Sequence, residues 1–478
     1  MYNLFLKIES IKIEIFFVIA GLIFGILSAL ITPPFQIPDE HSHFARAYQV
    51  SEGHLISEKR AFPQENGIIP YEYVNVFPRQ DQRFASGGEL PMSLAITFET
   101  ASKGIEYYAD RKYDPQNTML LLKQPLYKDQ KHFFHFANAA VYSPVPYIPQ
   151  SIGIVCGRYF DLSPLGLMYL GRITNLAVWL FAIYFAIRLI PFHKHLVLLL
   201  ALMPMDLFQA ASLSADACLN GFSFLLTGLT CRMAYEKDEP NYKDYFILFT
   251  ISLIVTLSKM AYLPLIGIIL LIPLNRSINK KNCCFLTIAF IVTCLIAGVL
   301  WIRVADKLYI PYVPDSSSRE QIQFILENPW KYISVIFSIL KTPGIHLIEE
   351  YIGRLGWLDI IFPIWFYVLY VVVILGVIIS EPLSNIKLCI HDNAIISLSI
   401  LSCVVLVITT VYLYWSPVGL DKVAIQGRYF IPLGPIAFLL ITNHFCLIKV
   451  HVRKTILYSF CLFSLCFMIL QLIHRYYL

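Results

Sequence analysis

Long apolar runs recur along the whole chain, and they limit what it can fold into more than any other feature. Runs of about 18 or more residues are long enough to cross the roughly 30 Å hydrocarbon core of a bilayer as α-helices. Hydrophobic residues make up 57% of the chain and charged residues only 14%, well below the roughly 25% that is usual in soluble domains. The sequence therefore predicts an all-α polytopic membrane protein.

The N-terminus is expected in the cytoplasm, because Lys7 and Lys12 flank the first run on that side. The first run is interpreted as a retained signal anchor, since it is longer than the apolar core of a signal peptide and has no clear cleavage site. The expected transmembrane helices, about eleven in number, are 11–32, 165–187, 195–212, 217–234, 245–258, 261–274, 283–302, 357–379, 393–414, 430–448 and 455–473.

Every inner loop of this topology is basic, as the positive-inside rule requires. The loops contain Arg188 and Lys194; Arg232, Lys237 and Lys243; Arg276, Lys280 and Lys281; Lys387; and Lys449, Arg453 and Lys454. The agreement requires residues 144–160 to form an outer juxtamembrane helix instead of a further span. Pro144, Pro146 and Pro149 at its start favour that assignment.

The topology divides the chain into five parts. In chain order they are the first transmembrane helix (1–32), an extracytoplasmic cap with the Asp39-Glu40 motif and the juxtamembrane helix (33–160), a transmembrane bundle (161–302), a second extracytoplasmic segment (303–356), and a C-terminal transmembrane bundle (357–478). The second extracytoplasmic segment is expected to contain an interfacial helix over 329–351. The loop 33–143 holds 24 of the chain's 69 Asp, Glu, Lys and Arg residues. We therefore expect it to form a compact, water-facing domain that is α-rich or mixed.

The cysteines and the net charge exclude several classes of function. None of the eleven cysteines lies between residues 33 and 143, and most of the others fall inside apolar runs, where they act as small hydrophobes. No Cys-x-x-Cys pair or Cys/His cluster indicates a zinc site. The net charge of +5 is explained by the basic inner loops, so nucleic acid is not an expected partner.

Four polar motifs fall on the outer side of this topology, at the ends of different spans. They are Asp39-Glu40-His41-Ser42-His43-Phe44-Ala45-Arg46, Ser212-Leu213-Ser214-Ala215-Asp216, Ser258-Lys259-Met260-Ala261-Tyr262-Leu263-Pro264 and Gln426-Gly427-Arg428-Tyr429-Phe430. The first places two adjacent carboxylates just past the first span. Paired acids so close to a bilayer are costly unless they are hydrated, paired or used in function. Convergence of the four motifs on one face predicts an active site.

The motifs also carry a resemblance to a known family. They are Pro38-Asp39-Glu40-x-x-His43-x-x-Arg46 followed by Gly53, Tyr142-Ser143-Pro144-x-Pro146-Tyr147, Ser214-Ala215-Asp216, Lys259-x-x-Tyr262-Leu263-Pro264 and Gln426-Gly427-Arg428-Tyr429. In order and spacing the chain resembles, over nearly its whole length, a bacterial family of multi-spanning membrane proteins of unknown function. More distantly it is similar to the GT-C superfamily of glycosyltransferases. The resemblance implies an enzyme of the bacterial inner membrane that uses a polyprenyl-phosphate-linked sugar donor on the extracytoplasmic side.

Such a transfer needs a carboxylate within about 2.6–3.2 Å of the acceptor hydroxyl, and Asp39 or Glu40 can serve. The leaving group is a lipid phosphate, so cations that hold it matter more than a general acid. Lys259 and Arg428 are the main candidates, with Tyr429 as an aromatic platform and Arg172 as a third cation. The residues expected to bind substrate are His43, Arg46, Asp216, Tyr262 and Gln426. No cofactor is required, although Asp39 and Glu40 could hold a divalent ion.

Each of these residues also has a purely structural interpretation. The two acids could stabilise the start of a helix that begins near His41, and Asp216 could cap its span together with Ser214. Lys259 could extend to the membrane interface, and Arg428 could anchor the chain at the outer interface. His41 and His43 are separated by one residue, so a helix would direct them to different faces and make them a poor joint metal site.

The leading hypothesis is a GT-C-like glycosyltransferase that moves one sugar to a cell-envelope glycan, such as an O-antigen or a wall polymer. One alternative is a transporter or flippase of lipid-linked saccharides. That class typically has ionisable residues near the membrane midplane and broken helices or internal repeats. A second alternative is a scaffold whose cap binds a partner, which predicts that the substitution Asp39→Asn is tolerated.

Overall fold

The computed structural model describes residues 10–61, 84–102, 105, 108–236, 239–276, 280–311, 316–341, 344–380, 388–421, 423, 425–445 and 454–478. Several positions used above to orient the chain lie outside these residues. They are Lys7, Lys237, Lys387, Lys449 and Arg453.

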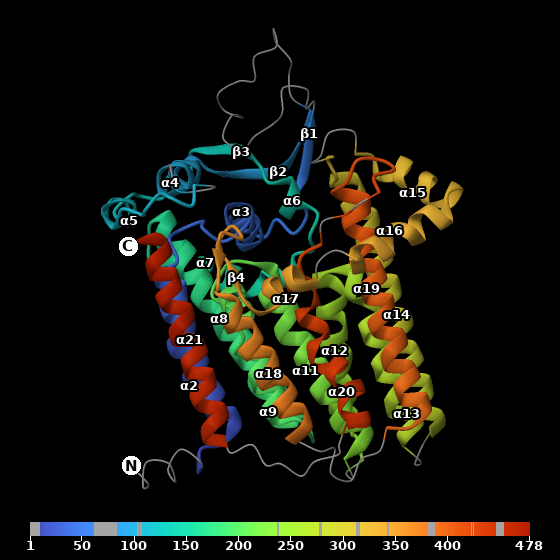
Figure 1. Ribbon diagram of the computed structural model, residues 1–478. Helices are drawn as coiled ribbons and strands as arrows, with labels where there is room; N and C mark the ends of the chain where they lie inside the picture. The colour runs from blue at the N-terminus through green and yellow to red at the C-terminus, as the bar shows by residue number, and fades with distance from the viewer. Residues whose placement is uncertain are drawn as a thin grey trace.

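The described chain is mostly helical, and its longest helices run side by side as a bundle (Figure 1). Among the described residues, five helices are long and apolar enough to cross a membrane. They are α2 (Ile13–Ile31), α8 (Pro164–Leu189), α14 (Lys280–Leu308), α19 (Ile390–Tyr414) and α21 (Lys454–Tyr476). Large apolar side chains also cover the outside of the bundle, such as Ile23 on α2 and Phe285 on α14, which are 51% and 72% exposed. This exposure suits a lipid environment, and the fold is that of a polytopic membrane protein.

The other predicted spans correspond to helices that are shorter or less apolar. These are α9 (Lys194–Ala201), α10 (Pro204–Ala210), α11 (Ala215–Tyr235), α12 (Tyr242–Ser258), the 3₁₀-helix η3 (Met260–Leu270), α13 (Leu271–Asn275), α18 (Ile364–Ser380), the 3₁₀-helix η4 (Gly427–Leu433) and α20 (Gly434–Phe445). Helix α18 begins seven residues later than predicted, because residues 354–361 form a small hairpin of β4 (Arg354–Leu355) and β5 (Ile360–Ile361).

Three spans predicted as continuous α-helices are interrupted. The span 195–212 breaks at Leu202 and Met203, directly before Pro204. Pro264 lies inside η3 and Pro432 inside η4, and each 3₁₀ segment continues into a short α-helix. Proline removes a backbone donor and collides with the preceding turn, so it ends or tightens an α-helix. The apolar pattern alone did not indicate these breaks.

The described residues of the loop 33–143, which forms most of the cap, make a mixed α/β layer at one end of the bundle (Figure 1). Its antiparallel sheet has the order β1-β2-β3, formed by Glu58–Ala61, Phe84–Pro91 and Lys131–His135. In the described part of this segment the helices are α3 (Glu40–Ser51), α4 (Met92–Ser102), α5 (Pro115–Leu121) and α6 (Ala137–Ala140). Phe44 and Tyr48 of α3 pack with Leu90 and Phe134 of the sheet in a separate apolar core. The all-α prediction therefore describes the bundle, and the mixed alternative expected for the loop 33–143 describes the cap.

Short helices join the cap to the bundle. The 3₁₀-helix η2 (Val145–Tyr147) leads into α7 (Ile148–Tyr159), which packs on α3 and α8 and leaves Ile148, Ile152 and Val155 exposed. This helix lies where the juxtamembrane helix was predicted. The second segment holds α15 (Ser318–Glu327), α16 (Pro329–Lys341) and α17 (Gly344–Ile352). Two helices thus occupy the region predicted as one interfacial helix, and α17 packs on η4.

Candidate functional site

Asp39 begins the site at the boundary between the cap and the bundle. It occupies the N-cap position of α3 in a left-handed conformation, with φ of 61° and ψ of 11°. Its carboxylate makes no capping hydrogen bond within α3 and instead accepts from Asn138 Nδ2 at 2.9 Å. A left-handed conformation is unfavourable for a residue other than glycine and is found disproportionately at functional sites. Helix capping therefore does not explain this carboxylate, which stays partly exposed.

Lys259 lies at the junction of α12 and η3, where its backbone leaves the helical conformation. Its ammonium group pairs with the Asp216 carboxylate at the start of α11. It also lies 5.6 Å from the ring centres of both Tyr142 and Tyr429, within the range of a cation–π interaction. The side chains of Lys259 and Asp216 retain 18% and 13% exposure. The pair is thus fixed in place, and both side chains remain partly exposed.

Arg428 enters the same region from η4. Its Nε donates to Gln426 Oε1 at 2.6 Å, and its guanidinium lies 5.7 Å from the Tyr429 ring centre. Tyr262 Oη donates to the Tyr429 carbonyl at 2.6 Å and so anchors η4 to η3. The sequence motifs of residues 259–262 and 426–429 therefore build one cationic wall.

Gly427 explains how α17 packs so closely on this wall. Its N–H donates to Glu350 Oε2 at 2.8 Å, and a Cβ atom built at this position would lie 1.9 Å from the Leu347 carbonyl oxygen. No side chain fits in that space, so glycine is required for the close approach.

Electrostatic interactions join these residues into one cluster. Arg428 interacts with both Asp39 and Asp216. The His43 ring interacts with the same three groups and with Lys259. The structure therefore brings together members of all four motifs. Their roles in binding or catalysis remain predictions.

His43 and two tyrosines form the neutral part of the cluster. His43 Nδ1 lies 2.8 Å from Tyr147 Oη, and the two share a hydrogen bond. Burial lowers the pKa of His43 from 6.5 to about 4, and nearby Asp39 and Asp216 only partly oppose that effect. Burial likewise raises the pKa of the Tyr142 and Tyr147 hydroxyls. At neutral pH all three side chains are uncharged hydrogen-bonding groups.

Glu40, the second predicted acid, has a different environment from Asp39. It is fully buried, and its carboxylate accepts four hydrogen bonds. The donors are the Phe35 N–H at 3.1 Å, the Leu213 N–H at 3.2 Å, and Nε and Nη2 of Arg172. We therefore assign Glu40 a structural role, in place of the predicted role as an alternative base.

Arg172 is reassigned for the same reason. Besides the two bonds to Glu40, its Nη1 donates to the Ala29 and Thr32 carbonyls and its Nη2 to the Pro33 carbonyl. All five N–H donors of the guanidinium are thus used inside the protein. These carbonyls lie at the end of α2, where helical bonding stops. Arg172 therefore caps α2 and has no donor left for a lipid phosphate.

Arg46, predicted to bind substrate, is also fully buried. It donates to Gln49 Oε1 at 2.6 Å and to the Leu55 carbonyl at 2.6 Å, with longer bonds to the His54 and Tyr142 carbonyls. These contacts fix the loop after α3 and the segment that carries Tyr142. Arg46 supports the site without facing it.

Asn138 was missed by the sequence reasoning, and Tyr142 and Tyr147 appeared there only as part of a motif. The two tyrosines flank a proline-rich turn in that motif, a signal that could have indicated two rings fixed on one side. Asn138 had no comparable signal.

The histidines at the start of α3 face different neighbours. The His41 ring lies against Phe98, whereas His43 faces Tyr142 and Tyr147. Within the described residues, no group of three or more His, Cys, Asp or Glu side chains is placed to hold a metal ion.

One comparison with known proteins gave a match. A family model described as "Predicted membrane protein (DUF2142)" matches residues 22–437. Neither the curated proteins nor the solved structures gave a match.

Breaking the Glu40–Arg172 pair should destabilise the protein strongly. We expect Arg172→Met to lower the free energy of unfolding by about 3–5 kcal/mol, because it leaves a buried carboxylate without its cation. The matched control is Arg188→Met on the same helix, since Arg188 is exposed and bonds to Tyr184 Oη. It should change stability by less than about 0.5 kcal/mol. Thermal unfolding in detergent measures both, and equal melting temperatures would contradict the structural role.

Stability should also fall in mild acid because of His43. The neutral ring is required in the folded state, so its contribution is present above pH 6.5 and is lost as the pH falls toward about 4. His43→Gln, which cannot titrate, should flatten this dependence between pH 6.5 and 4.5. Part of the slope should remain, because burial also lowers the pKa of His135 to about 4. Melting temperatures across this pH range test the prediction, and an unchanged slope in the variant would contradict it.

Proposed function

The chain belongs to the DUF2142 family of predicted membrane proteins, and from this premise and the geometry of the site we propose that it is a membrane glycosyltransferase. It transfers a sugar from a polyprenyl-phosphate-linked donor to a cell-envelope glycan on the extracytoplasmic side of the inner membrane. The observation that carries the proposal is the placement of one partly exposed carboxylate, Asp39, in a cluster with two cations, Lys259 and Arg428.

The two cations suit a lipid phosphate as the leaving group. In the proposed reaction the acceptor oxygen bonds to the anomeric carbon while the bond from that carbon to the phosphate oxygen breaks. The electron pair leaves on the phosphate, where Lys259 and Arg428 offset the developing negative charge. A single displacement of this kind inverts the configuration at the anomeric carbon.

Asp39 is the better general base of the acidic pair. Asn138 is the donor that orients its carboxylate, whereas Glu40 already accepts four hydrogen bonds. A base must have a lone pair directed at the acceptor hydroxyl. The acceptor proton therefore passes to Asp39. The neutral His43 and Tyr147 add hydrogen-bonding groups beside it, and the rings of Tyr142 and Tyr429 can stack on a sugar face.

An apolar pocket lined in part by η4, the segment that also carries Arg428, fits the lipid part of the donor. It has a volume of about 290 Å³, at the lower end of the range for ligand pockets. Its lining comes from α17 (Leu347, Ile348, Tyr351), α19 (Ile400, Val404) and the η4–α20 segment (Phe430, Leu433, Gly434, Ala437, Phe438).

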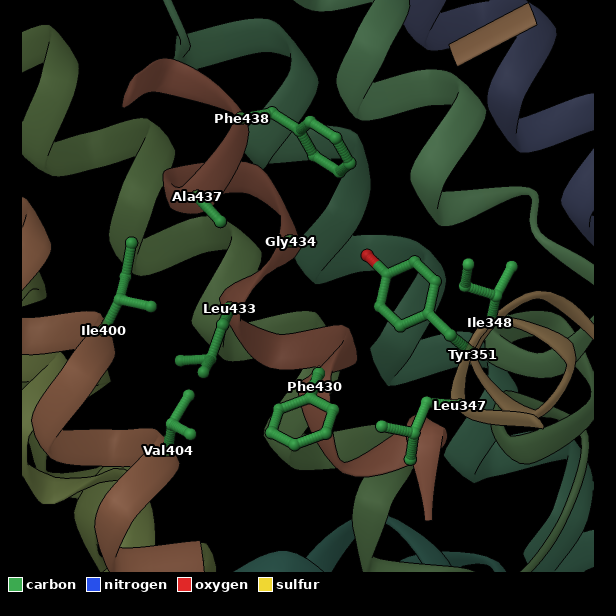
Figure 2. Close-up of a pocket in the computed structure, with 10 residues that line it drawn as sticks. All are labelled: Leu347, Ile348, Tyr351, Ile400, Val404, Phe430, Leu433, Gly434, Ala437 and Phe438. Atoms are coloured by element: carbon green, nitrogen blue, oxygen red, sulfur yellow. The ribbon is translucent and has the colours of Figure 1, made fainter. Parts of the chain in front are cut away.

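The pocket has a direction, with Phe430 and Leu347 near one end and Phe438 near the other (Figure 2). Phe430 follows Arg428 by two residues. A prenyl chain lying along α20 would thus have its phosphate at the cationic wall. We assign the pocket to the first units of that chain, with the remainder in the bilayer.

A transporter of lipid-linked saccharides is the second candidate. The breaks in three apolar segments, at residues 202–203 and in η3 and η4, resemble the discontinuous helices that such proteins use. Transport would need the same cations but no base. The two candidates therefore differ in their response to Asp39→Asn.

Substitutions in the cluster should separate chemistry from donor binding. Asp39→Asn should lower kcat by about 10²–10⁴-fold with little change in donor affinity, because it removes only the proton acceptor. Lys259→Ala and Arg428→Ala should each weaken donor binding by tenfold or more. The control is Lys128→Ala in the cap, an exposed cation paired with Asp161. The assay is sugar transfer from synthetic polyprenyl-phosphate donors to envelope glycan.

Two results would count against this function. A wild-type transfer rate in Asp39→Asn would remove the base from the mechanism. Movement of a lipid-linked saccharide across proteoliposomes, unaffected by Asp39→Asn and without any transfer, would favour the second candidate.

Filling the apolar pocket should affect donor affinity alone. We expect Ala437→Phe to raise KM for a long-chain donor by about tenfold and to leave kcat unchanged, because the tail contributes uniform binding. The matched control, Ala289→Phe, adds the same bulk on α14, which does not line the pocket. Equal KM values for the two variants would show that the tail binds elsewhere.

A further inference from the structure

Asp206 is a buried acid near the candidate site, and the proposed mechanism gives it no role. Asp206 is on α10, directly after the break at residues 202–203, and is completely buried. Among the described residues, no Lys or Arg forms an ion pair with it, and its neighbours include Trp179 and Asn220. A buried acid without a cation is less stable than an apolar residue of similar size. This position therefore needs an explanation beyond packing.

A chain of hydrogen bonds connects Asp206 to the site. Asn220 Nδ2 donates to Asp206 Oδ1 at 2.8 Å and to Gln209 Oε1 at 3.2 Å. Gln209 Nε2 in turn donates to Asp216 Oδ2 at 3.2 Å. The other oxygen of Asp216 pairs with Lys259. The chain thus ends at the ion pair that contributes one of the two cations.

The chain of hydrogen bonds has a defined direction from donor to acceptor at each link. Oδ1 of Asp206 is the acceptor at the start of the chain, so the NH₂ group of Asn220 is turned toward Asp206. That NH₂ group also faces Gln209 and therefore selects the amide oxygen of Gln209 as its partner. The NH₂ group of Gln209 is then left to face Asp216. In the opposite orientation, the Gln209 oxygen would lie against the Asp216 carboxylate and repel it.

We propose that Asp206 is a positioning residue that, through Asn220 and Gln209, keeps a hydrogen-bond donor on Asp216 and so tunes the charge that Lys259 presents to a ligand phosphate. The donated hydrogen bond disperses part of the negative charge of Asp216. Less of the Lys259 charge is then neutralised, and more remains for an anion. Two amides in series do not conduct protons readily, so the chain sets orientation and does not act as a proton wire.

The test is a swap that keeps the same two side chains but reverses the polarity of the chain. In the double variant Asp206→Asn, Asn220→Asp, the amide now at position 206 donates to the carboxylate now at position 220. That carboxylate then requires a donor from Gln209, so the Gln209 oxygen turns toward Asp216. Composition, volume and burial are preserved. The second variant, Gln209→Met, removes the middle of the chain, and the control, Thr227→Val, alters a buried hydroxyl that bonds only to the Ser223 carbonyl of its own helix.

The first readout requires no substrate. Acylation of Lys259 by acetic anhydride in the intact purified protein, followed by mass spectrometry of the peptide that carries Lys259, reports how strongly the ammonium group holds its proton. We expect the swap and Gln209→Met to slow acylation by about five- to tenfold, because Asp216 gains charge in both. Thr227→Val should match wild type. Once Gln209 is replaced, adding the swap should change the rate by less than about twofold, since the connection is already lost.

The second readout rests on the proposed function. Farnesyl phosphate should bind the swap and Gln209→Met about five- to tenfold more weakly than wild type, in the same order as the acylation rates. A wild-type acylation rate in the swap, or effects of the swap and of Gln209→Met that simply add, would overturn the positioning role. Failure of the wild-type protein to bind farnesyl phosphate, with the acylation pattern intact, would count against the lipid donor and leave the positioning role supported.

Discussion

The buried ion pair between Glu40 and Arg172 is the interaction on which the rest of the structure depends. Arg172 on α8 satisfies the last carbonyls of α2, and Glu40 fixes the backbone at Phe35 and Leu213. One pair thus joins the end of the first long helix, the start of the cap and the turn before α11. Burying both charges is tolerable because every donor and acceptor involved has a partner.

Two adjacent carboxylates, Asp39 and Glu40, have opposite environments. Glu40 points into the protein and is saturated with donors, whereas Asp39 accepts from Asn138 and interacts electrostatically with Arg428. The left-handed backbone at Asp39 lets the Asp39 and Glu40 side chains point in different directions. The hydrogen bonds of Glu40 hold the backbone in this conformation. A strong structural contact at Glu40 therefore positions the proposed base one residue before it.

The cationic wall depends on the close packing of the two interrupted helical segments, η3 and η4. Lys259 and Arg428 both lie where a helix is interrupted, in η3 and η4, and Tyr262 ties these segments together. Interrupted helices release backbone groups and turn side chains toward a common space, which regular helices crossing a bilayer seldom do. The apolar pocket and the buried Asp206 chain lie beside the same segments. These features are the ones from which the binding of a phosphate and a lipid tail is proposed.

The sequence by itself determined the helical bundle, because apolar length and basic loops depend only on local composition. It also indicated the four motifs that carry Asp39, Asp216, Lys259 and Arg428. Only the tertiary structure decided that Arg172 pairs with Glu40, that Asn138 orients Asp39, and that a small sheet covers the site. It also decided where the spans break. Each of these outcomes depends on which distant groups pack together, and a buried charge takes its role from the partners that satisfy it.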